Sequence, residues 1–322
     1  MRRAAKHLVV WGLVALTALA GCTETLVPTP PPVVTPPPVI VPPPPSIPQA
    51  DPPRSTASQE LSIYYRRLQN DLLAQDLLRG DGGGVDTPFT DEMLLRNFIR
   101  IAMFDEYAPG SGTRQAGGTP ALLRRWEQPI GMNIEFGATV PAAQRIRDTA
   151  SIGAYAARLS RLTNVPIRQN VVNANYTVMV LNEDDRAGYE GRLRSLLPGI
   201  EDATIRTFLN LPRDLLCVVI SVSQSNAPTY ARAVVLIRGE HPDVLRLTCI
   251  HEELAQGMGL ANDSPQARPS IFNDDNEFGL LTTQDEYLLR MLYDPRLSAG
   301  MRVEQAEPVA RMIAAELVGG SS

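Results

Sequence analysis

Three side chains within one short stretch have the types and the spacing of a hydrolytic metal site. Glu252 and Gln256 are four residues apart, and Glu253 stands next to the first of them. In a helix, residues four apart lie on one face, and the adjacent residue is turned by about 100°. Two such side chains can hold a metal ion while the neighbouring carboxylate activates a bound water molecule. The spacing therefore predicts a site built on one turn of helix.

The residues that follow extend this candidate site. Gly259 is suited to close the helix, and Asn262 and Asp263 come shortly after it, where the chain could return to the same point. We assign Glu253 as the candidate catalytic residue, acting as general base. The candidate metal ligands are Glu252, Gln256, Asn262 and Asp263.

The donor types restrict which ion could bind. Carboxylate and amide oxygens suit calcium, magnesium or manganese better than zinc. Glu252, Gln256 and Asn262 carry one formal negative charge between them. We therefore expect a divalent metal ion to be held weakly unless a further carboxylate joins them, from Asp263 or from one of Asp274, Asp275 and Glu277. The alternative is a solvated helix, in which Glu252 and Glu253 only complement the helix dipole and Gln256 bonds locally.

Histidine is scarce in this chain. Only His241 and His251 follow the N-terminal leader, so one chain cannot supply the three histidines of a common catalytic zinc site. We expect His251 to be a surface residue at the flank of the helix. His241 precedes Pro242 and is expected to be a turn residue rather than a ligand.

Two cysteines, Cys217 and Cys249, remain once the N-terminal cysteine is set aside. An even pair in an oxidising compartment predicts a disulfide. Two buried thiols are the alternative. A nucleophilic Cys249 assisted by His251 is disfavoured, because helix residues two apart point to different faces.

Residues 1–21 have the pattern of an export signal. A basic segment containing Lys6 precedes an apolar run, 8–20, that is short for a membrane span. The run ends in Leu-Ala-Gly-Cys, which resembles the lipobox of bacterial lipoproteins and implies lipidation of Cys22. Because Thr23 and not Asp follows, the resemblance implies the bacterial outer membrane, with the protein facing the periplasm. An ordinary secretory signal or an uncleaved anchor is the alternative.

The next segment, residues 22–55, is dominated by proline. Such a sequence adopts polyproline II geometry and cannot form a hydrophobic core, so we predict a disordered linker that acts as a spacer. We divide the remainder into an N-terminal helical segment, 56–110, and a larger domain, 111–322.

Charge and composition exclude several kinds of function. The formal net charge is −5, and Lys6 is the only lysine. The processed chain therefore has no lysine for a Schiff base or a phosphate-binding loop. No basic block is present, which argues against a nucleic-acid partner. The expected partners are the membrane, through the lipid, and a cell-envelope protein or peptide.

Hydrophobic periodicity predicts the elements that must position the site. Apolar residues recur at helical spacing in six segments: 57–78, 91–107 with Thr90 as N-cap, 142–162, 243–258, 284–293 and 306–317. Alternating or β-branched runs predict four strands: 132–136, 176–181, 216–222 and 231–237. This order predicts an α+β fold in which a mixed sheet packs on helices.

The motif resembles that of the metzincin peptidases, H-E-x-x-H-x-x-G-x-x-H. Started at Glu252, the spacing is kept, with oxygen-bearing side chains in place of the three histidines. Downstream, Phe272 stands where metzincins carry a methionine beneath the metal, and Leu292-Tyr293 ends a later helix. The resemblance implies a zincin-like fold for this domain.

A more specific resemblance covers nearly all of residues 60–315. The chain resembles the bacterial domain-of-unknown-function family DUF2927, in which Glu-Glu-x-x-Gln also replaces the histidine motif. The matching segments are 78–84, 87–90, 123–127, 238–242, 249–256, 270–275 and 292–297. The resemblance implies a zincin-like fold on a secreted or lipidated chain and brings no established activity.

Two main functional hypotheses follow. The first is a divergent metal-dependent peptidase that acts on peptide or envelope substrates. The second is a catalytically inactive pseudopeptidase that serves as a periplasmic protein-binding module. Site side chains that point away from one another, or a cleft filled by Phe272, would favour this second hypothesis. A purely structural envelope tether is a third alternative.

Overall fold

The computed structural model describes residues 51, 53–107, 115–224, 227–273 and 275–320. The predicted signal sequence, Cys22, nearly all of the predicted linker and Asp274 lie outside these residues. Gln49–Ser322 forms one compact unit. Within the described residues, no helix is both long and apolar enough to cross a membrane.

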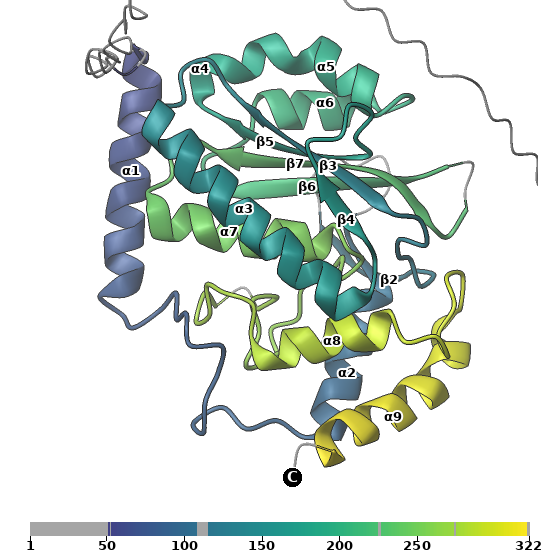
Figure 1. Ribbon diagram of the computed structural model, residues 1–322. Coiled ribbons are helices and arrows are strands. Elements are labelled where there is room, and N and C mark those ends of the chain that lie inside the picture. Colours follow the sequence, from purple (N-terminus) through teal and green to yellow (C-terminus); the bar gives the residue numbers. More distant parts are fainter. Residues whose placement is uncertain (1–50, 52, 108–114, 225–226, 274, 321–322) are drawn as a thin grey trace, which may run out of the picture. The chain divides into compact units, whose positions relative to one another are not determined.

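A five-stranded mixed sheet forms the centre of this unit, in the order β4-β3-β5-β7-β6 (Figure 1). β4, β3, β5 and β7 run parallel to one another, whereas β6 runs antiparallel to β7 at the edge of the sheet. The strands are β3 (Ile130–Phe136), β4 (Ile167–Gln169), β5 (Tyr176–Leu181), β6 (Cys217–Ser223) and β7 (Tyr230–Arg238). The predicted α+β class with a mixed sheet is therefore confirmed.

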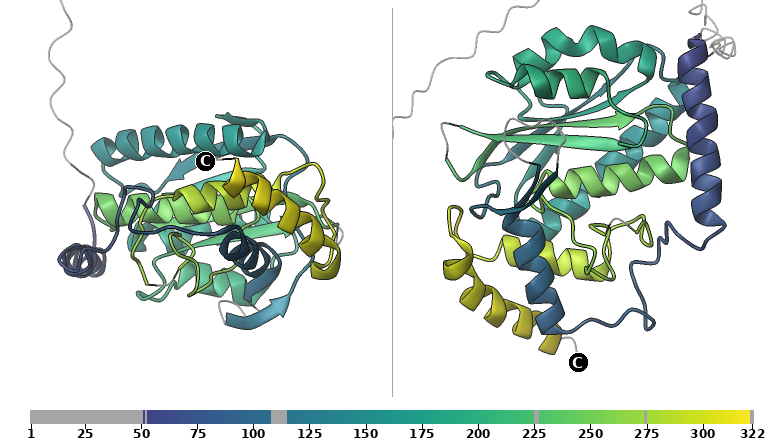
Figure 2. Two further views of the ribbon diagram at one scale, coloured as in Figure 1. Left: turned by 90° about the horizontal axis from the view of Figure 1, so that it is seen from below. Right: turned by 180° about the vertical axis from the view of Figure 1, so that it is seen from behind.

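Helices cover both faces of the sheet (Figures 1 and 2). On one face lie α3 (Ala142–Thr163) and α7 (Asp243–Gln256). On the other face lie three short helices and a 3-10 turn: α4 (Glu183–Arg186), η1 (Ala187–Tyr189), α5 (Glu190–Leu196) and α6 (Asp202–Leu209).

The central strand β5 contributes to both of these layers. Val178 and Val180 belong to the large core that includes residues of α3 and α7, whereas Met179 and Leu181 belong to a smaller core with α5 and α6. Successive strand residues point to opposite faces, so a strand covered on both sides is apolar at every position. This explains the continuous apolar run of β5.

The remaining elements lie outside these two layers. They are α1 (Thr56–Leu73), α2 (Asp91–Ala102), β1 (Phe104–Tyr107), β2 (Gln115–Pro120), α8 (Thr283–Leu292) and α9 (Val303–Gly319). Helix α1 contacts α7, and α2 packs against both α8 and α9. The short strands β1 and β2 form a separate antiparallel pair.

The second helix begins as predicted but ends earlier. The hydroxyl of Thr90 accepts a hydrogen bond from the backbone N–H of Met93, which caps α2. The predicted continuation to Tyr107 is wrong, because α2 ends at Ala102 and the next residues form β1, whose Phe104 pairs with Pro120 of β2. Strand pairing with a distant segment overrides the local helical pattern there.

Candidate functional site

Hydrogen bonds from two buried aromatic side chains fix the last turn of α7. The Tyr176 hydroxyl donates to the backbone carbonyl oxygens of Glu253 and Leu254, at 3.4 and 3.2 Å. The indole Nε1 of Trp126 donates to the carbonyl oxygen of Gly257 at 2.8 Å. Because Tyr176 belongs to β5, the sheet itself sets the position and rotation of the helix that carries the predicted motif.

Two glycines allow close contacts at and just after the end of α7. A Cβ atom at Gly257 would lie 2.1 Å from the Tyr176 hydroxyl oxygen, so no larger residue fits beneath this hydrogen bond. Gly259 has φ +120°, and a Cβ atom there would lie 2.4 Å from the carbonyl oxygen of Arg124. Both positions therefore require glycine.

A cavity of about 390 Å³ lies between β6 and α7. Its wall contains one guanidinium group, that of Arg124, and five carboxylates, those of Asp105, Asp214, Glu252, Glu253 and Asp263. Arg124 donates to both carboxylate oxygens of Asp105, at 2.7 and 2.8 Å. The other carboxylates leave the cavity with an excess of negative charge, which favours a cationic ligand.

The structure brings four of the five predicted site residues to this cavity: Glu252, Glu253, Gln256 and Asp263. The side chains of Glu253 and Gln256 are buried, and that of Glu252 is half-buried. Asn262 is placed elsewhere. Its side-chain amide donates to the carbonyl oxygen of Arg100 at 2.9 Å, and Asn262 is not among the residues that line the cavity.

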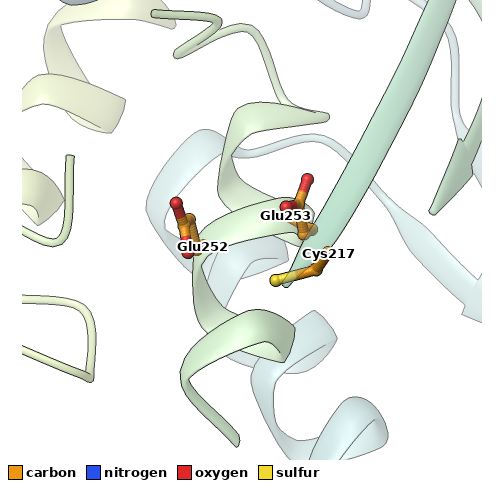
Figure 3. Close-up of side chains that lie close together, drawn as sticks. All are labelled: Cys217, Glu252 and Glu253. Carbon is orange, nitrogen blue, oxygen red and sulfur yellow. The ribbon is translucent and has the colours of Figure 1, made fainter. Parts of the chain in front are cut away.

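Three potential ligand atoms lie especially close together, one each from Cys217, Glu252 and Glu253, all within 4.8 Å of one another (Figure 3). The two glutamates come from α7, and the cysteine comes from the neighbouring β6. Cys217 is joined to Cys249 by a disulfide, with Cα atoms 5.9 Å apart. A disulfide sulfur lacks the charge of a thiolate, so in this state the close group offers two carboxylates.

A buried carboxylate holds the loop that forms another part of the cavity wall. Asp285 accepts hydrogen bonds from the Ser270 hydroxyl at 2.5 Å and from the backbone N–H of Thr282 at 2.9 Å. This ties the loop to the start of α8 and places Asn273 at the cavity. Phe272 is fully buried in the hydrophobic core and does not line the cavity, so it does not fill the cleft.

His251 is buried, and the prediction of a surface position is wrong. Its ring stacks on that of Tyr155 with centroids 4.0 Å apart, and its Nδ1 accepts a hydrogen bond from the Leu281 backbone N–H at 3.1 Å. Burial, with a smaller effect of the Arg158 guanidinium, lowers the pKa of His251 to about 3. The side chain is therefore a neutral packing residue, and it does not line the cavity.

His241 lies in the turn between β7 and α7, as predicted. Its ring packs edge-on against Tyr65 with centroids 4.4 Å apart, and its Nδ1 lies 3.7 Å from the sulfur of Cys249. Burial lowers the pKa of His241 well below its usual range, which keeps the ring neutral at physiological pH.

Several polar residues of the cavity were not predicted as site residues. Arg124 and Asn273 lie in segments 123–127 and 270–275, which carry the family resemblance. Their membership in these segments was a sequence signal that could have marked them as candidate site residues. Asp105 lies within the short strand β1 and Asp214 lies shortly before β6, and no local pattern marks either of them. Tertiary contacts bring them to the cavity.

Comparison with known families gives one result. The family described as "Protein of unknown function (DUF2927)" matches residues 91–312, more than half of the chain. No curated protein and no solved structure matches the chain. The matched range includes every residue that lines the acidic cavity. The chain therefore belongs to the DUF2927 family.

Proposed function

We propose that this domain binds an extended peptide segment along β6 and receives a cationic side chain of that peptide in the acidic cavity. One observation carries the proposal: the cavity lies directly against the edge strand, and residues 214–219 and Ser221 form part of its wall. A ligand in the cavity would therefore also meet the backbone of β6.

The edge of the sheet offers the hydrogen-bonding groups that a peptide needs. β6 pairs with β7 on one side, and among the described residues no strand pairs with its other side. An edge strand presents unpaired N–H and C=O groups that can accept an added strand. Peptide recognition by strand addition draws its affinity from the main chain and its specificity from pockets for side chains.

The charge of the cavity supplies the specificity. Five carboxylates and one guanidinium line it, so a lysine or arginine side chain of the peptide is attracted and an acidic one is repelled. Such complementarity mainly raises the association rate and excludes wrong partners. Binding that depends on it weakens as salt screens the charges.

The proposed location is the periplasmic side of the bacterial outer membrane, where Cys22 would carry the lipid and the proline-rich linker would act as a spacer. The Cys217–Cys249 disulfide supports this location, because disulfides persist in oxidising compartments such as the periplasm. The peptide would then belong to another cell-envelope protein.

The second candidate function is metal-dependent peptide hydrolysis by a divergent, metzincin-like domain. It is favoured by the shared position of Glu252, Glu253, Gln256 and Asp263 at one cavity. The first three are on α7, beside the antiparallel edge strand, and Asp263 follows the helix. These oxygen donors fit calcium, magnesium or manganese rather than zinc. Such an ion, when bound, would polarise a peptide carbonyl and acidify a water molecule. Glu253 would accept the proton of that water.

Peptide binding can be tested with full-length protein that carries Cys22→Ser, kept in mild detergent. Fluorescence polarisation would compare short peptides that differ only in a central Arg, Leu or Glu. We expect the Arg peptide to bind most tightly and to lose affinity as salt is added. Glu253→Gln and Asp263→Asn should each weaken it about threefold to tenfold, the loss of one charge interaction of up to about 1.4 kcal/mol.

The matched control is Glu60→Gln, which removes an exposed carboxylate of α1 that does not line the cavity. This variant should bind as the parent protein does. Equal binding of the three peptides, or an equal effect of the cavity and control substitutions, would overturn the proposal.

Hydrolysis is tested separately, by mass spectrometry of the Arg peptide incubated with protein and calcium, magnesium or manganese. Glu253→Gln should abolish metal-dependent cleavage. If no ion supports cleavage, the second candidate is rejected and the peptide-binding proposal stands.

A further inference from the structure

The disulfide between β6 and α7 has two unequal ends. Cys217 lines the acidic cavity, whereas Cys249 does not line it and is only 1% exposed. A reductant that enters the cavity therefore meets the sulfur of Cys217 first. Both cysteines are buried, with Cys217 6% exposed, but only the Cys217 end of the bond borders the cavity.

The cavity end of this bond lies within a potential ligand set. The sulfur of Cys217 and one carboxylate oxygen each of Glu252 and Glu253 lie within 4.8 Å of one another (Figure 3). We propose that reduction of the Cys217–Cys249 disulfide converts the cavity into a zinc site, whose ligands are the Cys217 thiolate and the carboxylates of Glu252 and Glu253. Metal loading is then controlled by the thiol redox state of the protein.

The change of donor explains the change of metal. With the disulfide intact, the site offers oxygen donors, which favour hard cations such as calcium and magnesium. A thiolate is a soft, charged ligand that zinc binds strongly. One thiolate and two carboxylates supply three negative charges around a divalent ion, and three protein ligands are the usual number in a zinc site that keeps a position for water.

A dithiol reductant can carry out the redox step. One of its thiolates attacks the sulfur of Cys217, the bond between the cysteines breaks, and Cys249 leaves as a thiolate that takes up a proton. The second thiol of the reductant then displaces Cys217 from the mixed disulfide and is itself oxidised to a disulfide. The protein gains two electrons and two protons, and Cys217 loses its proton again when it binds the metal.

The surroundings of both cysteines suit this exchange. The Nδ1 atom of His241 lies 3.7 Å from the sulfur of Cys249, so the released sulfur has a polar partner in an otherwise buried position. The ligands are also held without the disulfide, because β6 pairs along its length with β7 and the end of α7 is hydrogen-bonded to Tyr176 and Trp126. Reduction therefore leaves Cys217, Glu252 and Glu253 close together.

The inference rests on the proposed function in that both use one cavity, but its test measures metal and not peptide. Full-length protein with Cys22→Ser is kept oxidised or is reduced with a phosphine, and zinc binding is measured by equilibrium dialysis. We expect about one zinc ion per reduced chain, with at least tenfold higher affinity than in the oxidised protein. Cobalt as a probe should give a sulfur-to-metal charge-transfer band only after reduction.

Two variants provide a matched pair, because each removes the disulfide and only one keeps the ligand. Cys249→Ser leaves the Cys217 thiol and should bind zinc without any reductant. Cys217→Ser leaves the Cys249 thiol and should bind no better than the oxidised protein. Circular dichroism checks that both are folded. If either is not, the reduced parent is compared with its Glu253→Gln form, which should bind at least tenfold more weakly.

Equal zinc affinity of the oxidised and reduced proteins would overturn the inference. Equal zinc binding by the two cysteine variants would do the same. Loss of peptide binding alone would contradict only the proposed function, because the zinc measurement contains no peptide.

Discussion

The hydroxyl oxygen of Tyr176 lies 3.2 Å from the backbone carbonyl oxygen of Leu254 and donates a hydrogen bond to it. Tyr176 is the first residue of the central strand β5, and Leu254 lies in the last turn of α7. This contact joins the central strand of the sheet to the helix that presents Glu252 and Glu253. The position of both carboxylates in the cavity therefore depends on the packing of α7 against the sheet.

Removing this hydroxyl should destabilise the protein. Tyr176→Phe takes the donor away from buried carbonyl oxygens, and we expect the free energy of unfolding to fall by about 1–2 kcal/mol. Urea denaturation followed by circular dichroism measures this. Tyr64→Phe, on half-buried Tyr64 of α1, is the control and should have little effect. An equal decrease in the free energy of unfolding in both variants would show that the hydrogen bond from Tyr176 to α7 adds no stability of its own.

Adding a methyl group beneath the same hydroxyl should be more damaging. In Gly257→Ala the new Cβ would lie 2.1 Å from the Tyr176 hydroxyl oxygen, so the helix end or the tyrosine must move, at a cost of about 1–3 kcal/mol. The control is Gly191→Ala in α5, where a Cβ would meet nothing within 4 Å. That change should be neutral or stabilise by up to about 1 kcal/mol. A thermal unfolding experiment that ranks Gly257→Ala as equal to the control contradicts this prediction.

His251 should make the protein less stable in mild acid. Its pKa is lowered by burial to about 3, against about 6.5 in an unfolded chain. Between about pH 6.5 and about pH 3 the unfolded chain binds a proton that the folded protein does not bind. The free energy of unfolding therefore has its full value above about pH 6.5 and decreases as the pH falls from about 6.5 toward about 3. The slope from this residue is up to about 1.4 kcal/mol per pH unit.

His251→Gln tests this, because a glutamine oxygen can still accept the hydrogen bond of the Leu281 N–H. Urea denaturation at pH 7 and pH 5 should show a smaller acid-induced loss in the variant than in the parent. Part of the loss will persist, because burial lowers the pKa of His241 as well. An identical pH dependence in the two proteins would refute the assignment.

Arg124 should weaken the attraction of the cavity for cations. Arg124→Gln removes the one guanidinium found among the described residues that line the cavity and releases the charge of Asp105. We expect the Arg-centred peptide to bind about twofold to fivefold more tightly at low salt, with the gain lost at high salt. Fluorescence polarisation at two salt concentrations measures this. Arg67→Gln, an exposed change on α1, is the control, and weaker peptide binding by Arg124→Gln would contradict the electrostatic account.

Local sequence patterns predicted the parts of this protein that depend on neighbours in the chain. The strand 176–181 coincides with β5, and the helix predicted over 243–258 differs from α7 only by two residues at its end. Glu252, Glu253 and Gln256 share one cavity because residues three and four apart lie on one helical face whatever the rest of the fold does. The regular repeat of helices and strands determines which side chains share a face, so these features can be predicted from the spacing of residues in the sequence.

Only the tertiary structure decided where segments distant in sequence meet. Asn262 follows the motif closely in sequence. The chain turns at Gly259, however, and the side-chain amide of Asn262 donates a hydrogen bond to the carbonyl oxygen of Arg100. His251 is polar and lies beside the acidic pair, yet the packing of α3 and of the loop before α8 buries it. Asp105 reaches the cavity through the β1–β2 pair. A side chain's neighbours across the fold depend on the summed packing of many elements, which no local spacing encodes.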